Sequence, residues 1–170
     1  YAFYYCNALK SVTIPEGVTS IGYNAFYNCP ELTSVTIPAS VTSIGSVVFG
    51  YCTSLMSINV VQNNEKYCSV DGVLFNKDMS EIIAYPGGKS GDYSIPESVT
   101  YLGSGVFDGC SGLTAVTLPK DIRVDYYSYS YGDYSYDYGY SPFTNCTSLK
   151  KIIVDPENSS LCSKTGVLFD

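Results

Sequence analysis

The chain of 170 residues contains no histidine and no tryptophan, and only 15% of its residues are charged. Histidine is the commonest general base and the commonest metal ligand in proteins, so its absence excludes Ser-His-Asp and Cys-His catalysis within this segment. The sequence also lacks a phosphate-binding glycine motif and a pair of carboxylates arranged for glycoside hydrolysis. We therefore expect that the chain is not an enzyme and that it uses no cofactor.

Positive charge and long apolar runs are scarce as well. Lys and Arg total 9 against 16 Asp and Glu, which gives a formal net charge of −7. Because nucleic acids and anionic membrane surfaces attract basic patches, this balance argues against both as partners. No apolar run approaches the roughly 20 residues that a membrane-spanning helix requires, so direct membrane insertion is not expected. Hydrophobic residues still make up 45% of the chain, which is enough for one sizeable core.

The sequence repeats itself at intervals of 23 residues. Phe3, Phe26 and Phe49 mark three copies of one pattern, which reads A-F-x-x-C-x-x-L-x-x-V-x-I-P-x-x-V-x-x-I-G in the first two, and further copies contain Phe107 and Phe143. A larger unit recurs 94 residues apart, because residues 49–75 and 143–169 both carry F-x-x-C-T-S-L, then I-x-V, then C-S-x-x-G-V-L-F. Self-similarity at a fixed period of about 20–50 residues is typical of a solenoid.

Each copy predicts a strand, a turn and a compact outer segment. The segment V-x-I-P alternates apolar positions at the period of a strand, and proline then ends the strand because it cannot donate to a ladder. The segment A-F-x-x-C-x-x-L has helical spacing but is too short for a stable free helix, so it predicts a helical or 3₁₀ turn. Since one coil cannot bury its own apolar side, the coils must stack. We expect about seven to nine coils, spaced at about 4.8 Å per strand.

The pattern C-x-x-L-x-x-V-x-I-P-x-x-V-x-x-I-G-x-x-A-F, interleaved with D-G-V-L-F-N-K-D at residues 71–78, resembles the BspA-like leucine-rich repeats of bacterial surface proteins. The resemblance covers nearly the whole chain apart from residues 124–141. It implies an α/β-type leucine-rich-repeat solenoid, with a parallel β-sheet on the concave face and short helical or 3₁₀ turns on the convex face. Residues 1–170 would then form a single solenoid that is truncated within repeats at both ends.

Five of the seven cysteines occupy one column of the repeat, and the other two share a second column. The first column holds Cys6, Cys29, Cys52, Cys110 and Cys146, and the second holds Cys68 and Cys162. Cysteine often packs as a small buried hydrophobe, so stacked core thiols are the main interpretation. Disulfides between coils are an alternative, although parallel side chains rarely reach the torsion that a disulfide needs. A metal site is disfavoured because the chain has neither a C-x-x-C pair nor histidine.

An insertion rich in Tyr, Ser and Gly interrupts the repeat at residues 126–141. Phe107 and Phe143 are 36 residues apart instead of 23, and Tyr alternates with Ser on both sides of Gly132-Asp133. A glycine followed by a polar residue suits a two-residue hairpin turn. That turn pairs Tyr131 with Tyr134, Tyr129 with Tyr136, and Tyr127 with Tyr138, all on one face. Because antibody loops use Tyr, Ser and Gly for contact, we expect this hairpin to bind a protein or glycan. Packing of the rings on the solenoid flank and disorder are the alternatives.

The outward positions of the expected concave sheet are small and mostly uncharged. Side chains that could hydrogen-bond a ligand there are Thr13, Thr36, Asn59 and Thr117. A solvated sheet face is the alternative, because no large aromatic residue or arginine is present there to anchor a partner.

The resemblance implies a bacterial cell-surface or secreted protein that binds host matrix proteins or other cells, and the hairpin adds glycans to the partners expected. The function expected is therefore a non-catalytic protein-binding or adhesion module. The alternatives are a structural spacer that displays other domains, or a non-catalytic part of a larger enzyme. Open solenoid ends would also permit self-association.

Overall fold

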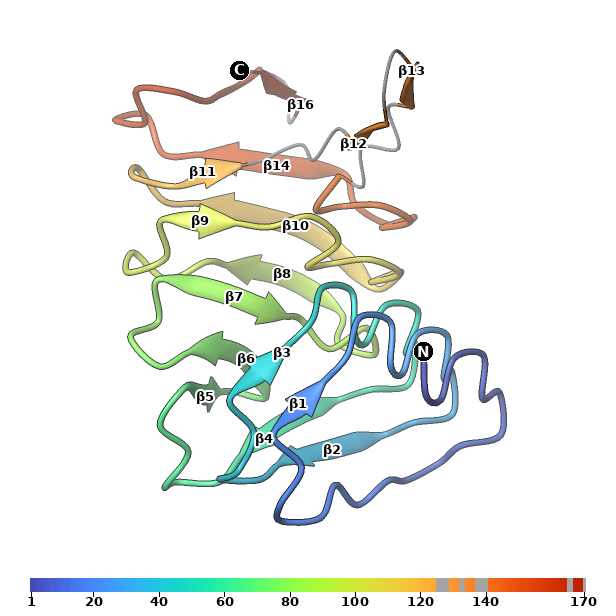
Figure 1. Ribbon diagram of the computed structural model, residues 1–170. Coiled ribbons are helices and arrows are strands. Elements are labelled where there is room, and N and C mark those ends of the chain that lie inside the picture. The colour runs from blue at the N-terminus through green and yellow to red at the C-terminus, as the bar shows by residue number, and fades with distance from the viewer. Residues whose placement is uncertain (125–128, 132–133, 137–140, 165–166, 170) are drawn as a thin grey trace.

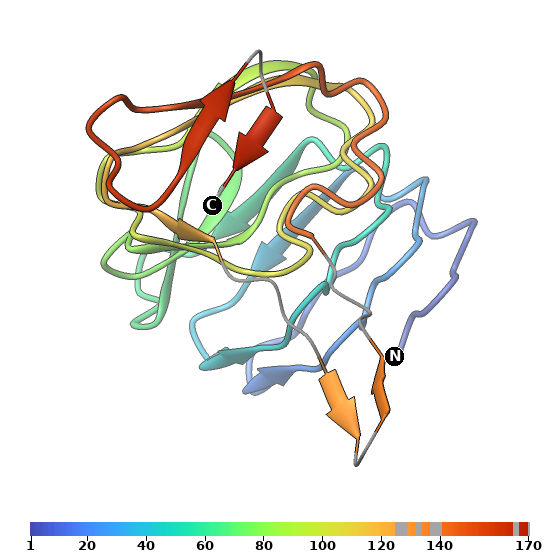
Figure 2. The same ribbon diagram turned by 90° about the horizontal axis from the view of Figure 1, so that it is seen from above.

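The computed structural model describes residues 1–124, 129–131, 134–136, 141–164 and 167–169 (Figure 1). The chain winds into a stack of coils, from the N-terminal coils at the bottom of Figure 1 to the C-terminal segment at its top. Seen from above, successive coils of the upper half follow nearly the same outline (Figure 2). No helix in these ranges is long and apolar enough to cross a membrane.

The V-x-I-P segments form the longer parallel strands. They are β2 (Ser34–Ile37), β4 (Ser57–Val60), β8 (Gly91–Ser94), β10 (Leu113–Leu118) and β14 (Lys151–Val154). β2 pairs with β4, and β10 lies between β8 and β14. The register joins Val35 to Ile58, so positions 23 residues apart lie side by side. The apolar side chains of β2 point into the core while Ser34 and Thr36 point outward, which confirms the alternation expected from the sequence.

The V-x-x-I-G segments form a second set of short parallel strands. They are β1 (Ser20–Ile21), β3 (Ser43–Ile44), β9 (Tyr101–Leu102) and β11 (Arg123–Val124). β1 pairs with β3, and β9 pairs with β11. Repeated coils therefore carry a long strand and a short strand, and the apolar residues of both pack into shared core clusters.

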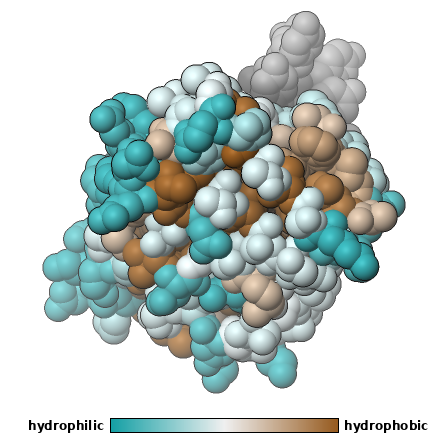
Figure 3. All heavy atoms as spheres, turned by 90° about the horizontal axis from the view of Figure 1, so that it is seen from below, coloured by the Kyte–Doolittle hydropathy of each residue, from teal (hydrophilic) through white to brown (hydrophobic). Residues whose placement is uncertain are grey.

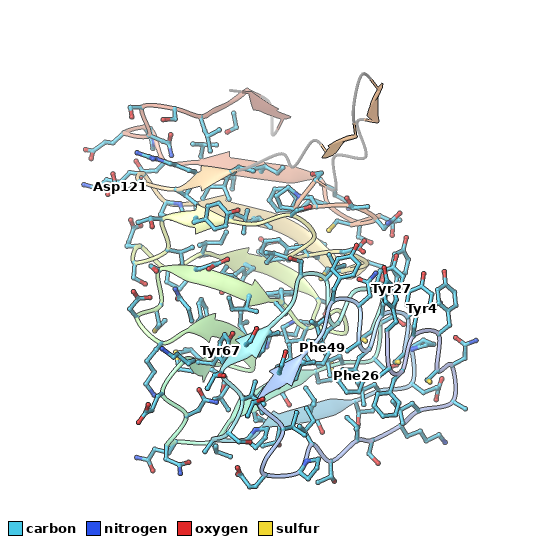
Figure 4. The ribbon with its side chains drawn as sticks, in the orientation of Figure 1. Tyr4, Phe26, Tyr27, Phe49, Tyr67 and Asp121 are labelled. Carbon is cyan, nitrogen blue, oxygen red and sulfur yellow. The ribbon has the colours of Figure 1, made fainter. Side chains whose placement is uncertain are left out.

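Residues 67–84 depart from the parallel arrangement. β5 (Tyr67–Val70), β6 (Val73–Asn76) and β7 (Glu81–Ala84) form an antiparallel meander, and β7 then pairs parallel with β9. The β5–β6 turn holds Asp71 and Gly72 at φ 50° and 78°, as a tight hairpin of this kind requires. The hydroxyl of Tyr67 accepts a hydrogen bond from the Ile44 N–H at 2.9 Å, which ties the meander to β3 (Figure 4). The parallel pairing expected for the coils is therefore present, but this meander interrupts it.

The larger repeat is visible in the backbone pairing. β15 (Cys162–Lys164) and β16 (Val167–Phe169) are antiparallel and join Cys162 to Phe169. β5 and β6 join Cys68 to Phe75 in the same way. The recurrence at 94 residues is thus a recurrence of one hairpin.

The insertion contains a further antiparallel pair, β12 (Tyr129–Tyr131) and β13 (Tyr134–Tyr136). Tyr131 pairs with Tyr134, and Tyr129 pairs with Tyr136, which is the register given by a two-residue turn at 132–133. The turn residues and the pair Tyr127–Tyr138 lie outside the described residues.

The outer A-F-x-x-C segments are tandem turns, and the described residues contain no helix. The expected helical or 3₁₀ turns are therefore not found there. Tyr5, Asn28 and Tyr51, which share one position of the repeat, have φ of 60°, 56° and 57°. A left-handed residue interrupts a right-handed helix. The N–H of Phe26 donates to Val48 O of the next coil at 3.0 Å, and that of Asn28 donates to Gly50 O at 2.8 Å. Because each N–H donates between coils, it is not available for a helix.

The phenylalanine column is the centre of this stacking. The rings of Phe3 and Phe26 are stacked at 5.1 Å, and those of Phe26 and Phe49 at 5.6 Å. Phe107 and Phe143 are stacked at 5.3 Å in the other half. The expected file of phenylalanines is therefore confirmed, and Figure 4 shows Phe26 and Phe49 as neighbours.

Candidate functional site

The cysteine column belongs to the core. The cysteines whose side chains are described are free thiols, namely Cys6, Cys29, Cys52, Cys68, Cys110 and Cys146. The thiol of Cys29 donates to Phe3 O and that of Cys52 to Phe26 O, both at 3.1 Å. Burial raises the pKa of Cys52 to about 12 and that of Cys146 to about 11. Such thiols remain protonated at neutral pH, so they are poor nucleophiles and poor metal ligands.

We expect Cys52 to resist alkylation by iodoacetamide at about pH 8 in the folded protein and to react once urea unfolds it. Because folding raises its pKa from 9.0 to about 12, the folded state holds the thiol proton more tightly. The resulting stabilisation is complete below about pH 9 and is lost as the pH rises from there toward about 12. Mass spectrometry of labelled peptides, with urea denaturation at both ends of this window, measures both effects. Rapid labelling of Cys52 in the folded protein contradicts the assignment.

Tyrosines gather on the surface of the N-terminal outer turns. We call this cluster the tyrosine ladder, and it consists of Tyr1, Tyr4, Tyr5, Tyr23, Tyr27 and Tyr51. The rings of Tyr4 and Tyr27 are stacked at 5.4 Å, and those of Tyr27 and Tyr51 lie 5.5 Å apart. Tyr1 contacts both Tyr4 and Tyr23 edge-on. Exposed fractions of 67% for Tyr1, 52% for Tyr5 and 42% for Tyr4 leave much of the aromatic surface open to a partner.

The backbone of the outer turns builds the ladder. Tyr4 and Tyr27 directly follow the stacked Phe3 and Phe26 in the chain, and Figure 4 places them outside the phenylalanine column. The same stacking of coils that packs the phenylalanines therefore stacks the tyrosines. This ladder is not among the sites predicted from the sequence, although the first two copies of the repeat read A-F-Y-Y-C and A-F-Y-N-C at these positions.

The hairpin emerges beside the same outer turns. It lies in the chain between β11 and the outer turn that contains Phe143. In the earlier coil, the corresponding link between β1 and the outer turn of Phe26 contains Tyr23 and Asn24. Figures 1 and 2 both show β12 and β13 on the side of the N-terminal outer turns. The side chains of the predicted site residues Tyr127, Tyr129, Tyr131, Tyr134, Tyr136 and Tyr138 lie outside the described part of the chain.

Three of the four predicted polar residues lie on the longer strands, which form two sheets, and Thr13 lies outside any strand. Thr36 and Asn59 are paired in register and exposed, and Thr13 is exposed one repeat earlier. Thr117 is half-buried and pairs with Ser94 and Ile153 on the other sheet. The β5–β6 turn, Asp71 and Gly72, lies between the two sheets. The Ile58 N–H of one sheet donates to Gly72 O at 2.8 Å, and the Lys89 amine, next to the other sheet, donates to Asp71 O at 2.9 Å. Thr117 therefore does not share a surface with the other three.

The N-terminal end of the stack presents an apolar surface. A shallow hollow of about 230 Å³ there is lined mainly by apolar residues, among them Phe3, Val12, Ile14 and Val18. Figure 3 shows hydrophobic residues across the lower face of the molecule. These residues occupy repeat positions that later coils bury, such as Phe26 and Val35.

Comparison with known proteins identifies the repeat. Residues 1–85 and 83–165 match the model of the BspA type leucine rich repeat region in six copies. This number is below the seven to nine coils expected, and residues 67–84 form the meander instead of further parallel coils. No curated protein matches the chain.

Three solved bacterial structures are similar to the chain. The pneumococcal vaccine antigen PcpA is 31% identical, with a TM-score of 0.66 over 78% of this chain and 30% of that one. A leucine-rich repeat protein of Eubacterium ventriosum is 25% identical, with a TM-score of 0.62 over 84% of this chain and 41% of that one. A leucine rich cell surface protein of Faecalibacterium prausnitzii is 28% identical, with a TM-score of 0.54 over 72% of this chain and 39% of that one. The chain thus spans less than half the length of each. On the family match over nearly its whole length, the chain belongs to the BspA-type leucine-rich-repeat family.

Proposed function

We propose that the chain is a non-catalytic protein-binding or adhesion module of a bacterial cell-surface or secreted protein. Its main contact surface is a tyrosine edge, which we define as the tyrosine ladder together with the hairpin β12–β13. The exposed, mutually stacked rings of the ladder are the observation that supports this most directly. Tyrosine is enriched at binding hot spots because it offers a large rigid surface with a hydroxyl that both donates and accepts.

The partner is a protein or glycan on a host or neighbouring cell. The ladder suits either, since ring faces pack on apolar protein or sugar surfaces while the hydroxyls pair with polar groups. Similarity to a vaccine antigen and to a cell surface protein supports a location where such partners are met. Thr13, Thr36 and Asn59 add a secondary polar surface, and Thr117 contributes to a separate one. Self-association through the solenoid ends would use the apolar N-terminal end.

A structural spacer that displays other domains is the second candidate. The close stacking of the coils through the phenylalanine column makes the chain a rigid support. The chain also spans only 30% to 41% of the similar solved proteins, which leaves much of each of them for other roles. A non-catalytic part of a larger enzyme is the third reading.

Replacing Tyr4, Tyr5 and Tyr27 together with serine is expected to weaken partner binding about tenfold or more, because hot-spot tyrosines contribute about 2 kcal/mol or more each. Binding is measured by biolayer interferometry on immobilised collagen, fibronectin, laminin and mucin. Deletion of residues 126–141 tests the hairpin in the same assay. Ile153→Ser is the matched control, because Ile153 is 45% exposed on a strand that is not part of the tyrosine edge.

Binding that survives both changes contradicts the tyrosine edge. Absence of binding by the intact chain to all four surfaces favours the spacer. Circular dichroism and the melting temperature should show that the variants are folded, since the substituted rings are exposed or half-buried and their pairwise contacts are worth only about 0.5–1.5 kcal/mol each.

A further inference from the structure

A polar pocket lies away from the tyrosine edge, between two coil turns and the loop that follows β14. Its volume is about 490 Å³, within the range of about 300–1,000 Å³ typical of small-molecule sites. The residues that line it are Thr100, Tyr101, Lys120, Asp121, Ile122, Arg123, Ser159 and Ser160. Figure 4 shows Asp121 at one edge of the molecule and Tyr4 and Tyr27 at the opposite edge.

Hydrogen bonds join the two turns and the loop that form the walls of the pocket, and a buried side chain anchors one turn. The Arg123 N–H donates to Thr100 O at 2.9 Å, which joins the two coil turns. Asn158 attaches the loop, because its amide donates to Pro119 O at 3.2 Å and to Ile122 O at 3.4 Å. Its Oδ1 accepts from the Ser160 N–H at 2.9 Å. Ile122 is 1% exposed, so the turn that carries Lys120, Asp121 and Arg123 is anchored in the core.

The pocket carries positive charge on an acidic protein. Its lining holds two cations, Lys120 and Arg123, and one carboxylate, Asp121, while the chain as a whole has a net charge of −7. Within the described ranges, no ion pair or hydrogen bond occupies the side chains of Lys120 and Arg123. Two exposed cations thus border a cleft with their charge available to a ligand.

The first half of the chain contains the same turn without charges on it, while the loop residues that correspond there to Ser159 and Ser160 are Glu65 and Lys66. Asn64 donates to Pro38 O and Val41 O, as Asn158 does to Pro119 O and Ile122 O. The residues of this earlier turn that correspond to Lys120, Asp121 and Arg123 are Ala39, Ser40 and Thr42. Since the turn folds with neutral residues there, packing does not require the basic residues of the later turn. Their presence points to a ligand.

We propose that this pocket binds an acidic oligosaccharide, with the carboxylate or sulfate group of one sugar held by Arg123 and Lys120. A planar guanidinium binds either oxyanion with two parallel hydrogen bonds. Thr100, Ser159 and Ser160 supply hydroxyls for the hydroxyl groups of the sugar, and Asp121 accepts from one of them. A hydroxyl-rich lining with more polar than apolar surface suits a sugar better than a peptide, which usually needs an apolar anchor. The inference goes beyond the tyrosine edge and does not depend on it.

The test is isothermal titration of the intact chain with four probes. Hyaluronan tetrasaccharide carries carboxylates, chondroitin sulfate tetrasaccharide adds sulfates, chitotetraose is neutral, and tetraglutamate is an acidic peptide. We expect the two acidic saccharides to bind and chitotetraose not to bind. Tighter binding of the sulfated probe assigns the pocket to sulfate, and equal binding of the two assigns it to carboxylate. Binding should weaken as salt is raised.

Three single substitutions locate the binding. Arg123→Gln is expected to lower the affinity for the acidic saccharides about tenfold or more, since it removes a charge-assisted hydrogen bond. Asp121→Asn should raise the affinity for the same saccharides, because it removes a negative charge that repels them. Lys10→Gln changes the net charge of the chain as much as Arg123→Gln does, at an exposed residue outside the pocket, and should leave binding unchanged.

The proposed binding site is overturned if neither acidic saccharide binds, or if Arg123→Gln and Lys10→Gln lose the same amount of affinity. Tetraglutamate binding as tightly as the saccharides overturns the assignment to a sugar. The serine variants of the tyrosine ladder should bind hyaluronan as the unaltered chain does, so failure of either proposal can be told from failure of the other.

Discussion

Replacing Phe26 with alanine is expected to destabilise the chain by about 3–5 kcal/mol, which is the usual cost of removing a fully buried phenylalanine. Phe26 is 3% exposed and stacks against Phe3 at 5.1 Å on one side and Phe49 at 5.6 Å on the other. Its loss leaves a cavity between two coils, which the rings above and below cannot close without shifting their own turns. Urea denaturation followed by circular dichroism measures the change in the free energy of unfolding.

Phe3→Ala is the matched control for this substitution. Phe3 occupies the same repeat position but is 38% exposed, so less apolar surface is lost and the cavity opens to solvent. We expect a loss of about 1–2 kcal/mol from the reduced burial. An equal or larger loss for Phe3→Ala contradicts the view that stacking between coils is the main source of stability.

Asn64→Ala is expected to cost about 3 kcal/mol or more, although it removes only one small polar group. Asn64 is 1% exposed. Its amide donates to Pro38 O at 2.8 Å and to Val41 O at 3.0 Å. Its Oδ1 accepts from the N–H groups of Lys66 at 2.9 Å and Tyr67 at 2.8 Å. Removing the side chain leaves buried backbone groups without partners, and each costs about 1–3 kcal/mol.

The internal repeat supplies the control for Asn64. Asn158 makes the equivalent hydrogen bonds but is only half-buried, so water can replace its side chain and Asn158→Ala should cost less. Asn64→Asp keeps the acceptor but loses the donor and buries a charge, so we expect it to destabilise about as much as Asn64→Ala. Thermal denaturation of the three variants shows which of them loses the most stability. A loss below about 1 kcal/mol for Asn64→Ala contradicts the role assigned to these four bonds.

The repeat period allowed the core of the fold to be predicted in detail. Positions that recur every 23 residues lie side by side, as the pairing of Val35 with Ile58 shows. Phe3, Phe26 and Phe49 form the expected file. The register of β12 and β13 also coincides with the one derived from the Gly132-Asp133 turn. For the coils, the recurring pattern leaves one arrangement that buries their apolar sides. For β12 and β13, the two-residue turn fixes the register.

The candidate site was harder to predict. Neither the tyrosine ladder nor the polar pocket has a motif of its own. Tyr4, Tyr27 and Tyr51 occupy two adjacent columns of the repeat, and only the outer-turn geometry makes them neighbours. The pocket joins Thr100, Arg123 and Ser160, which come from three separate segments of the chain. Conversely, Thr117 has the same sequence context as Thr36 but lies on a different sheet.

The amino-acid pattern was sufficient for the stacked coils, their strands and the buried aromatic file, because these depend on burying an apolar side that recurs at a constant interval. The conformation of the outer turns and the antiparallel meander depend instead on which backbone groups find partners in another coil. The N–H of Asn28 donates to Gly50 O and not along a helix, and β6 pairs with β5 and β7 and not with a coil above it. Such pairings join residues distant in sequence, so they exist only once the coils have stacked.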